Sequence, residues 1–152
     1  TRASGVDGDV WCHRDPSVTE PDVIEVAAGL VFRDGKLLIT RRRAGDHLGG
    51  LWEFPGGKRL PHESYSQCLQ RELEEELGIG VNPLETIETV VHDYPGKRVR
   101  LEFFRCELIR GEPTPIECDA LEWITRHQIH QFEFPAADAT LLEKVRTTDR
   151  WW

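Results

Sequence analysis

The feature that most constrains the fold is a leucine repeat that leads into a dense cluster of acidic side chains. Its leucines recur every four residues, which is the spacing of a buried stripe on one face of a helix. They are Leu69, Leu73 and Leu77. Ser64 with Gln67 three residues later matches a capping box, and Gly78 is a natural terminator. The pattern predicts a helix from Tyr65 to Leu77 that packs against a core.

Four carboxylates crowd the second half of this helix, at Glu72, Glu74, Glu75 and Glu76. Neighbouring like charges destabilise a helix by a few tenths of a kcal/mol per pair, and the helix dipole disfavours negative charge towards the C-terminus. Glu72, Glu75 and Glu76 share one face, whereas Glu74 points elsewhere and is expected to be a solvated surface residue. One interpretation is a solvated acidic face. The other is a site for Mg²⁺ or Mn²⁺, since these hard cations prefer oxygen ligands.

The remaining patterns predict a mixed α/β domain. Strands are expected at residues 24–32, 37–42, 85–92, 99–109 and 120–124, and a closing helix at 136–145 after Pro135. Residues 44–62 form a long loop whose Leu51, Trp52 and Phe54 favour a packed, functional segment. Residues 1–22 lack periodicity and are expected to form a flexible N-terminal arm before a domain of residues 23–152. The order of elements suggests a mixed β-sheet sandwiched between helices, an α/β/α arrangement.

Composition narrows the function classes. The chain has 152 residues, enough for one domain with a real core, and its longest apolar run is too short to cross a bilayer. A net charge of −8 argues against binding a nucleic-acid polymer, but not against a single nucleotide held through cations. The four scattered cysteines favour reduced thiols in a cytoplasmic protein. A monomer or a homodimer is equally compatible with these data.

The segment from residue 57 to residue 79 resembles the signature of the Nudix hydrolase family. That signature runs Gly, five residues, Glu, seven residues, Arg-Glu, an aliphatic residue, any residue, Glu-Glu, any residue, Gly and an aliphatic residue. Its fixed positions are all matched, by Gly57, Glu63, Arg71, Glu72, Leu73, Glu75, Glu76, Gly78 and Ile79. The resemblance implies the Nudix fold and hydrolysis of a small nucleotide, with water attacking phosphorus.

The same resemblance assigns roles to individual residues. Glu72, Glu75 and Glu76 would bind Mg²⁺, or alternatively Mn²⁺, with the Gly57 carbonyl and Glu117 as further ligands. A surface role for Glu117 stays open, because its alignment crosses a loop. Arg71 is expected to pair with Glu63 and hold the loop against the helix. A bound metal lowers the pKa of its water towards neutrality. The general base is Glu72, Glu75 or Glu117.

Outside the signature, Trp52 to Lys58 and Phe134 to Asp138 resemble the MutT-like branch, which hydrolyses 8-oxo-dGTP to the monophosphate and pyrophosphate. The resemblance implies that Arg42 and Lys58 bind phosphates. Phe54 either stacks on the base or belongs to the core.

Asp138 stands where the MutT type carries the Asn that reads the base. An ionised Asp only accepts hydrogen bonds, which suits the N7–H of oxidised guanine or the amine of cytosine. A related branch that hydrolyses CTP and modified dCTP has Ala-Asp at this place. Asp138 could instead be a helix-start residue that favours the dipole. The expected activity is therefore 8-oxo-dGTP diphosphatase. The alternatives are a CTP or modified-dCTP pyrophosphohydrolase and the non-enzymatic lesion-recognition module of an adenine DNA glycosylase.

Overall fold

The computed structural model describes residues 22–152, so the predicted arm lies outside the described residues apart from Asp22. The described chain forms one mixed sheet with the order β3-β2-β1-β6-β5, in which β4 also pairs with β1 and β7 with β2. The strands are β1 (Asp22–Arg33), β2 (Lys36–Arg41), β3 (Trp52–Glu53), β4 (Gly56–Lys58), β5 (Gly80–Tyr94), β6 (Lys97–Arg110) and β7 (Ala120–Ile124). Strands β1 and β6 run parallel, and the other pairs are antiparallel.

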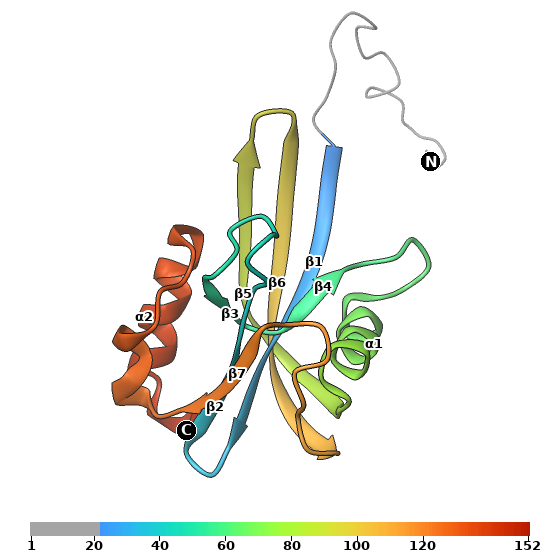
Figure 1. Cartoon of the computed structure of the whole chain (residues 1–152). Helices are drawn as coiled ribbons and strands as arrows, with labels where there is room; N and C mark the ends of the chain where they lie inside the picture. The colour runs from blue at the N-terminus through green and yellow to red at the C-terminus, as the bar shows by residue number, and fades with distance from the viewer. Residues whose placement is uncertain (1–21) are drawn as a thin grey trace, which may run out of the picture.

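The two faces of the sheet are covered by different helices, α1 (Tyr65–Leu77) and α2 (Ala139–Thr147), as Figure 1 shows. The α1 face buries the predicted leucine stripe against Val31, Leu38 and Phe104. The α2 face buries Leu141 and Val145 against other strand residues. The predicted α/β/α sandwich is therefore confirmed. Neither helix among residues 22–152 combines the length and apolarity that spanning a membrane requires.

Local chemistry explains the best-predicted elements. Ser64 Oγ accepts from the Gln67 N–H at 3.0 Å, the Gln67 side chain accepts from the Ser64 N–H at 2.9 Å, and Gly78 ends α1 with a φ of 70°. The β1–β2 hairpin turns through Asp34 and Gly35, whose φ values of 53° and 76° are those of a two-residue type I′ turn. Both elements begin and end within one or two residues of their predicted bounds.

Other bounds differ from the predictions for physical reasons. The predicted loop at 44–62 contains β3 and β4, which are too short to show a period in sequence. Strand β4 pairs Gly57 with Ala27, and a Cβ on Gly56 would collide with the Ala27 carbonyl. The closing helix is interrupted: the 3₁₀ turn η3 (Ala136–Asp138) precedes α2. The 3₁₀ turns η2 (Arg126–Gln131) and η4 (Asp149–Trp151) were not predicted.

Candidate active site

A cavity of about 620 Å³ opens on the α2 face of the sheet and continues to the acidic flank of α1. Its lining comes from β1, the loop after β2, β3, β4, α1, β5, β6, the segment between β6 and β7, and the segment before α2. Most of the predicted site residues line this cavity, namely Arg42, Phe54, Gly57, Lys58, Glu72, Glu76, Glu117 and Asp138. Glu63, Arg71 and Glu75 are not part of the lining and lie beside it on the loop and on α1.

The predicted pairing of Arg71 with Glu63 is present in bidentate form. Arg71 Nε donates to Glu63 Oε2 at 2.5 Å, and Nη2 donates to Oε1 at 3.0 Å. These bonds and the Leu60 N–H hold the pKa of the Glu63 carboxyl at about 2. The pair therefore fastens the loop between β4 and α1 to the helix in the ionised state.

Arg71 also reaches the predicted metal ligands. Its Nη1 lies 3.1 Å from Glu72 Oε2 and 3.2 Å from Glu75 Oε1, and its Nη2 donates to the Lys58 carbonyl at 3.1 Å. One guanidinium thus connects Glu63 with two carboxylates of the acidic face. It offsets part of their mutual repulsion.

Glu76 is the most strongly perturbed acid of the cavity. Burial raises the pKa of its carboxyl to about 9, and the negative charges of Glu53, Glu72 and Glu117 act in the same direction. Burial also raises the pKa of Glu72, against the opposing effect of Arg71. These shifts show that several acids face one another in a poorly solvated space, where each favours the neutral form of the next.

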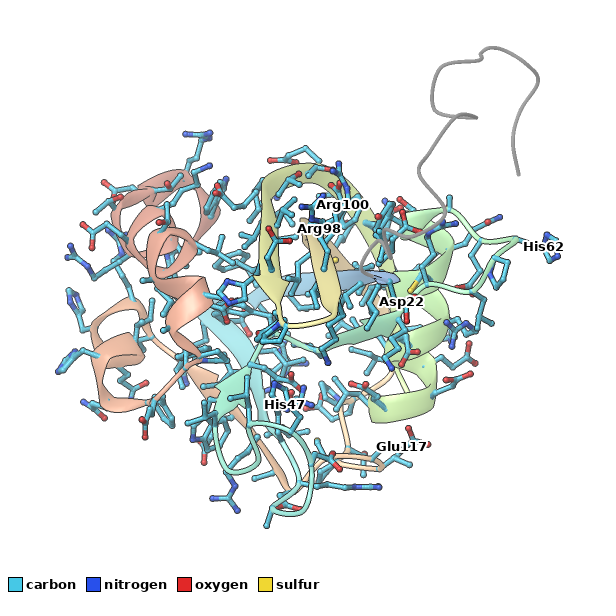
Figure 2. All side chains as sticks on the ribbon, turned by 90° about the horizontal axis from the view of Figure 1, so that it is seen from above. Asp22, His47, His62, Arg98, Arg100 and Glu117 are labelled. Atoms are coloured by element: carbon cyan, nitrogen blue, oxygen red, sulfur yellow. The ribbon has the colours of Figure 1, made fainter. Side chains whose placement is uncertain are left out.

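Glu117 is brought to this cluster by the segment between β6 and β7. The Ile116 and Glu117 N–H groups donate to the Glu76 carbonyl at 3.0 and 3.3 Å. Figure 2 shows Glu117, which belongs to this segment, beside α1. Glu117, which the resemblance aligned across a loop, therefore lines the same cavity as Glu72 and Glu76.

The donor set suits a hard divalent cation, since it consists of carboxylate and carbonyl oxygens. Among residues 22–152, however, no three acid, His or Cys side chains converge at ligand distance. Arg71 holds Glu72 and Glu75, and the half-exposed Glu75 points out of the cavity lining. The Gly57 carbonyl accepts from Cys68 Sγ at 3.4 Å, so one of its two lone pairs faces α1. Each contact with Arg71 engages one carboxylate oxygen, Glu72 Oε2 or Glu75 Oε1, so the second oxygen of each side chain is available to a cation while Arg71 holds the first.

Gly57 has a steric role besides its predicted one. Its Cα faces Glu72, and a Cβ there would collide with the Glu72 carboxylate. A larger residue at position 57 would therefore force the flexible Glu72 side chain to move, which would displace a proposed cation ligand.

Asp138 is buried, with 7% of its surface exposed, and it occupies the N-cap position of α2. Its side chain makes no cap hydrogen bond there, and it lines the cavity instead. Burial, and to a lesser extent the charge of Glu53, raises the pKa of Asp138 to about 6. Asp138 therefore lies at the helix start, as the alternative interpretation expected, and also lines the cavity.

Glu53 is a cavity residue that the sequence interpretation missed. Its Oε1 accepts from Arg42 Nη1 at 2.8 Å, while Arg42 Nε donates to the His47 carbonyl at 2.7 Å. Burial raises the pKa of Glu53 in spite of this pairing. Arg42, the predicted phosphate ligand, therefore lies in the cavity with part of its guanidinium already engaged. The unusual charge inside the motif from Trp52 to Phe54 was the available signal for Glu53.

Phe54 and Lys58 lie on the lining in different ways. Phe54 is 4% exposed and packs on Phe103 and Phe134, with ring centroids 6.2 and 5.3 Å apart. It belongs to the core, as the second interpretation expected, and it also forms cavity wall. Lys58 is exposed at the end of β4.

The β5–β6 hairpin contributes a rim that sequence reasoning also missed. His92, Tyr94 and Lys97 line the cavity, together with His47 from the loop after β2. The centroid of the Tyr94 ring lies 4.5 Å from that of His92 and 6.0 Å from that of His47. Lys97 Nζ lies 5.4 Å from the Tyr94 centroid. The rim forms where β5 and β6, together with the start of β1, extend beyond the shorter strands of the sheet (Figure 1).

Comparison with known sequences agrees with this geometry. The family model described as the NUDIX domain matches residues 27–144. The CTP pyrophosphohydrolase of Escherichia coli (strain K12) is 38% identical over 121 residues, which cover 80% of this chain and 90% of that protein. The 8-oxo-dGTP diphosphatase of Haemophilus influenzae is 35% identical over 124 residues, covering 81% and 91%.

Solved structures agree as well. The solution structure of the E. coli ORF135 protein is similar with a TM-score of 0.73 and 37% identity, covering 81% of this chain and 88% of that one. The crystal structure of the MutT protein from Methanosarcina mazei Go1 gives a TM-score of 0.75 and 26% identity, covering 88% and 97%. The family match covers most of the chain, and Gly57, Glu72 and Glu76 of the signature line the cavity, so the chain belongs to the Nudix family and is a MutT-like hydrolase.

Proposed function

We propose that this hydrolase cleaves nucleoside triphosphates to the monophosphate and pyrophosphate with Mg²⁺, and that 8-oxo-dGTP is its principal substrate. One observation carries the proposal. The acids Glu72, Glu76 and Glu117 line the same cavity as the buried Asp138, which makes no cap hydrogen bond. A single ligand in this cavity can therefore contact cation ligands and a hydrogen-bonding carboxylate.

The acidic residues explain the dependence on a divalent cation. Glu72, Glu75, Glu76, Glu117 and the Gly57 carbonyl would hold Mg²⁺, or Mn²⁺ in its place. The cation would neutralise phosphate charge and lower the pKa of the attacking water. Arg71 and Glu63 keep the helix and loop in register. Glu72 and Glu117, which face the cavity, and Glu75 remain the candidates for accepting the water's proton.

The nucleotide is held by the chain's own side chains. Arg42 has donors besides the two bound by Glu53 and His47, and with Lys58 it would bind phosphate oxygens. Phe54 offers a rigid aromatic wall for the base. Asp138 would accept hydrogen bonds from the base edge. Its pKa of about 6 leaves it mainly ionised at neutral pH.

CTP and modified dCTP form the second candidate substrate class. An ionised Asp138 suits the exocyclic amine of cytosine as well as the N7–H of oxidised guanine. The E. coli relative at 38% identity is itself named a CTP pyrophosphohydrolase. A non-enzymatic lesion-recognition role finds no such support, because the relatives compared are named as hydrolases.

Two measurements test the proposal. A pyrophosphate-release screen over 8-oxo-dGTP, dGTP, CTP and dCTP with Mg²⁺ should give the highest kcat/KM for 8-oxo-dGTP. A preference for CTP would transfer the assignment to the second class. Hydrolysis in ¹⁸O-labelled water should deliver the label to pyrophosphate, whereas label found only in the monophosphate would indicate attack at the α-phosphorus.

We further propose that the enzyme acts in the cytoplasm, in sanitation of the nucleotide pool that supports DNA repair and replication. The cysteines of the described chain, Cys68, Cys106 and Cys118, are free thiols, as expected for a reducing compartment.

A further inference from the structure

The loop between β4 and α1 is fixed at its start by the side chain of Arg59. Arg59 Nε donates to Glu25 Oε1 on β1 at 2.9 Å, and Nη2 contacts the same oxygen. Arg59 Nη1 donates to the backbone carbonyl of Glu63 at 2.7 Å. One guanidinium therefore connects β1 to Glu63, the residue whose carboxylate accepts two hydrogen bonds from Arg71.

The same guanidinium faces the start of α1. Its Cζ lies 5.4 Å from the ring centroid of Tyr65, the first residue of the helix. The helix dipole disfavours a cation at this end, so stabilisation of α1 alone does not account for an arginine here. Glu25 supplies the compensating charge, and its hydrogen bond to Arg59 is the main reason that its pKa is lowered.

The contacts continue from Glu63 to the acidic face. Glu63 holds Arg71 through two hydrogen bonds, and Arg71 contacts Glu72 and Glu75. Figure 2 shows His62 at the outer end of the loop with its side chain pointing away from the domain. The loop therefore projects at its tip while Arg59 and Glu63 hold its two ends.

Position 59 lies between the fixed positions Gly57 and Glu63 of the family signature, where no particular residue is required. Both partners of the pair are half-buried, with 24% of the Arg59 and 32% of the Glu25 side chain exposed. A pair so placed is screened less than one in open solvent. It is a feature of this chain beyond the signature.

We propose that Glu25 and Arg59 are a positioning pair, which fixes Glu63 and thereby lets Arg71 orient Glu72 and Glu75 for cation binding. The inference rests on the proposed role of these two glutamates as cation ligands. Partners bonded directly to metal ligands typically change metal affinity by about 10- to 100-fold when removed, and this pair acts through Glu63 and Arg71, so its effect is expected at the lower end of that range.

The test is Mn²⁺ affinity without nucleotide, measured from the electron paramagnetic resonance signal of free Mn²⁺. Arg59→Gln should raise the dissociation constant about tenfold. Glu25→Gln should act in the same direction, and the double variant should add little to either change. Arg59→Lys keeps the charge and should restore part of the affinity. The cation concentration for half-maximal activity should rise in parallel, with KM for the nucleotide at saturating cation nearly unchanged.

Two control variants separate the possible outcomes. Arg105→Gln removes a comparable bidentate pair, with Glu85 at 3.0 and 3.1 Å, and should leave Mn²⁺ affinity unchanged. Glu75→Gln tests the proposed metal site itself, which fails if this variant binds Mn²⁺ like the wild type. If Glu75→Gln weakens binding while Arg59→Gln and Glu25→Gln do not, only the positioning inference is overturned. Should Arg59→Gln fail to fold, Glu25→Gln and Arg59→Lys decide it in the same assay.

Discussion

The two helices that cover the sheet contribute to the cavity in different ways. Helix α1 has a complete capping box, ends at a glycine and carries its acids on a flank beside the leucine stripe. Helix α2 is shorter, follows a 3₁₀ turn and begins at an aspartate whose side chain makes no cap bond. The ends of α1 are thus satisfied by local hydrogen bonds, whereas the start of α2 leaves the Asp138 carboxylate to the cavity.

This difference separates two kinds of functional chemistry. The proposed cation ligands lie mostly within one continuous segment, so helical geometry sets their spacing. The proposed base-reading residues come from distant parts of the chain, and their spacing depends on how α2 packs against the sheet. We therefore expect changes on α1 to affect turnover with every nucleotide, and changes near α2 to affect the choice among nucleotides.

The largest expected effect is on the α1 side. Glu75→Gln or Glu76→Gln should lower kcat by at least roughly a hundredfold with every substrate, because a lost ligand removes charge stabilisation in the transition state. Steady-state kinetics with Mg²⁺ would measure this. Glu74→Gln is the matched control, because Glu74 is exposed and its carboxylate makes a surface ion pair with Arg110 at 3.6 Å. Near-normal turnover in either of the first two variants would contradict the proposed site.

The next effect is on the α2 side. Asp138→Asn should change the ratio of kcat/KM for 8-oxo-dGTP to that for CTP by roughly five- to a hundredfold. A buried hydrogen bond to a base edge is worth about 1–3 kcal/mol, and the amide exchanges an acceptor for a donor. Parallel kinetics on both substrates measure the ratio. An unchanged ratio with a lowered melting temperature would assign Asp138 a structural role only.

A third prediction uses the pH dependence of stability. Asp138 has a pKa of about 6 in the folded protein against an ordinary value of 3.8. Between these values the folded state binds more protons than the unfolded state, so the free energy of unfolding falls as pH rises. The fall from pH 4 to pH 6 should amount to about 2 kcal/mol from this group. Urea denaturation of wild type and Asp138→Asn at both pH values isolates the contribution. An equal change in the free energy of unfolding between the two pH values in both proteins would refute it.

The smallest effect should come from the cap of α1. Ser64→Ala removes the hydrogen bond to the Gln67 N–H and should cost about 1 kcal/mol of stability. Both the substrate ratio and the Mn²⁺ affinity should stay within roughly twofold of wild type, because the lost cap hydrogen bond lies away from the cavity. Thermal denaturation and the same kinetic assays check both statements. A changed substrate ratio would mean that the two sides are not independent.

Several elements followed from local sequence alone. The capping box, the leucine spacing and Gly78 were enough to place α1, and Asp34-Gly35 was enough to place the first hairpin. In each case the determining contacts join residues close in sequence. The pairing of Arg71 with Glu63 was also predictable, because the two positions belong to one signature.

Other features came only from tertiary structure. Strands β3 and β4 exist because β2 and β1 offer them edges, and neither has a period of its own. The pairing of Arg42 with Glu53 depends on how β3 lies beside β2. Arg59 likewise meets Glu25 only because β4 lies against β1.

The sequence by itself determined that this chain has an acidic helix preceded by a loop that contains glycines, since helix spacing and turn chemistry act over a few residues. Only the tertiary structure decided which other side chains share the cavity with that helix. The physical reason is burial: the pKa of Glu76 near 9 and that of Asp138 near 6 arise from desolvation by segments distant in sequence. Desolvation depends on what packs around a group, and no local pattern of residues encodes it.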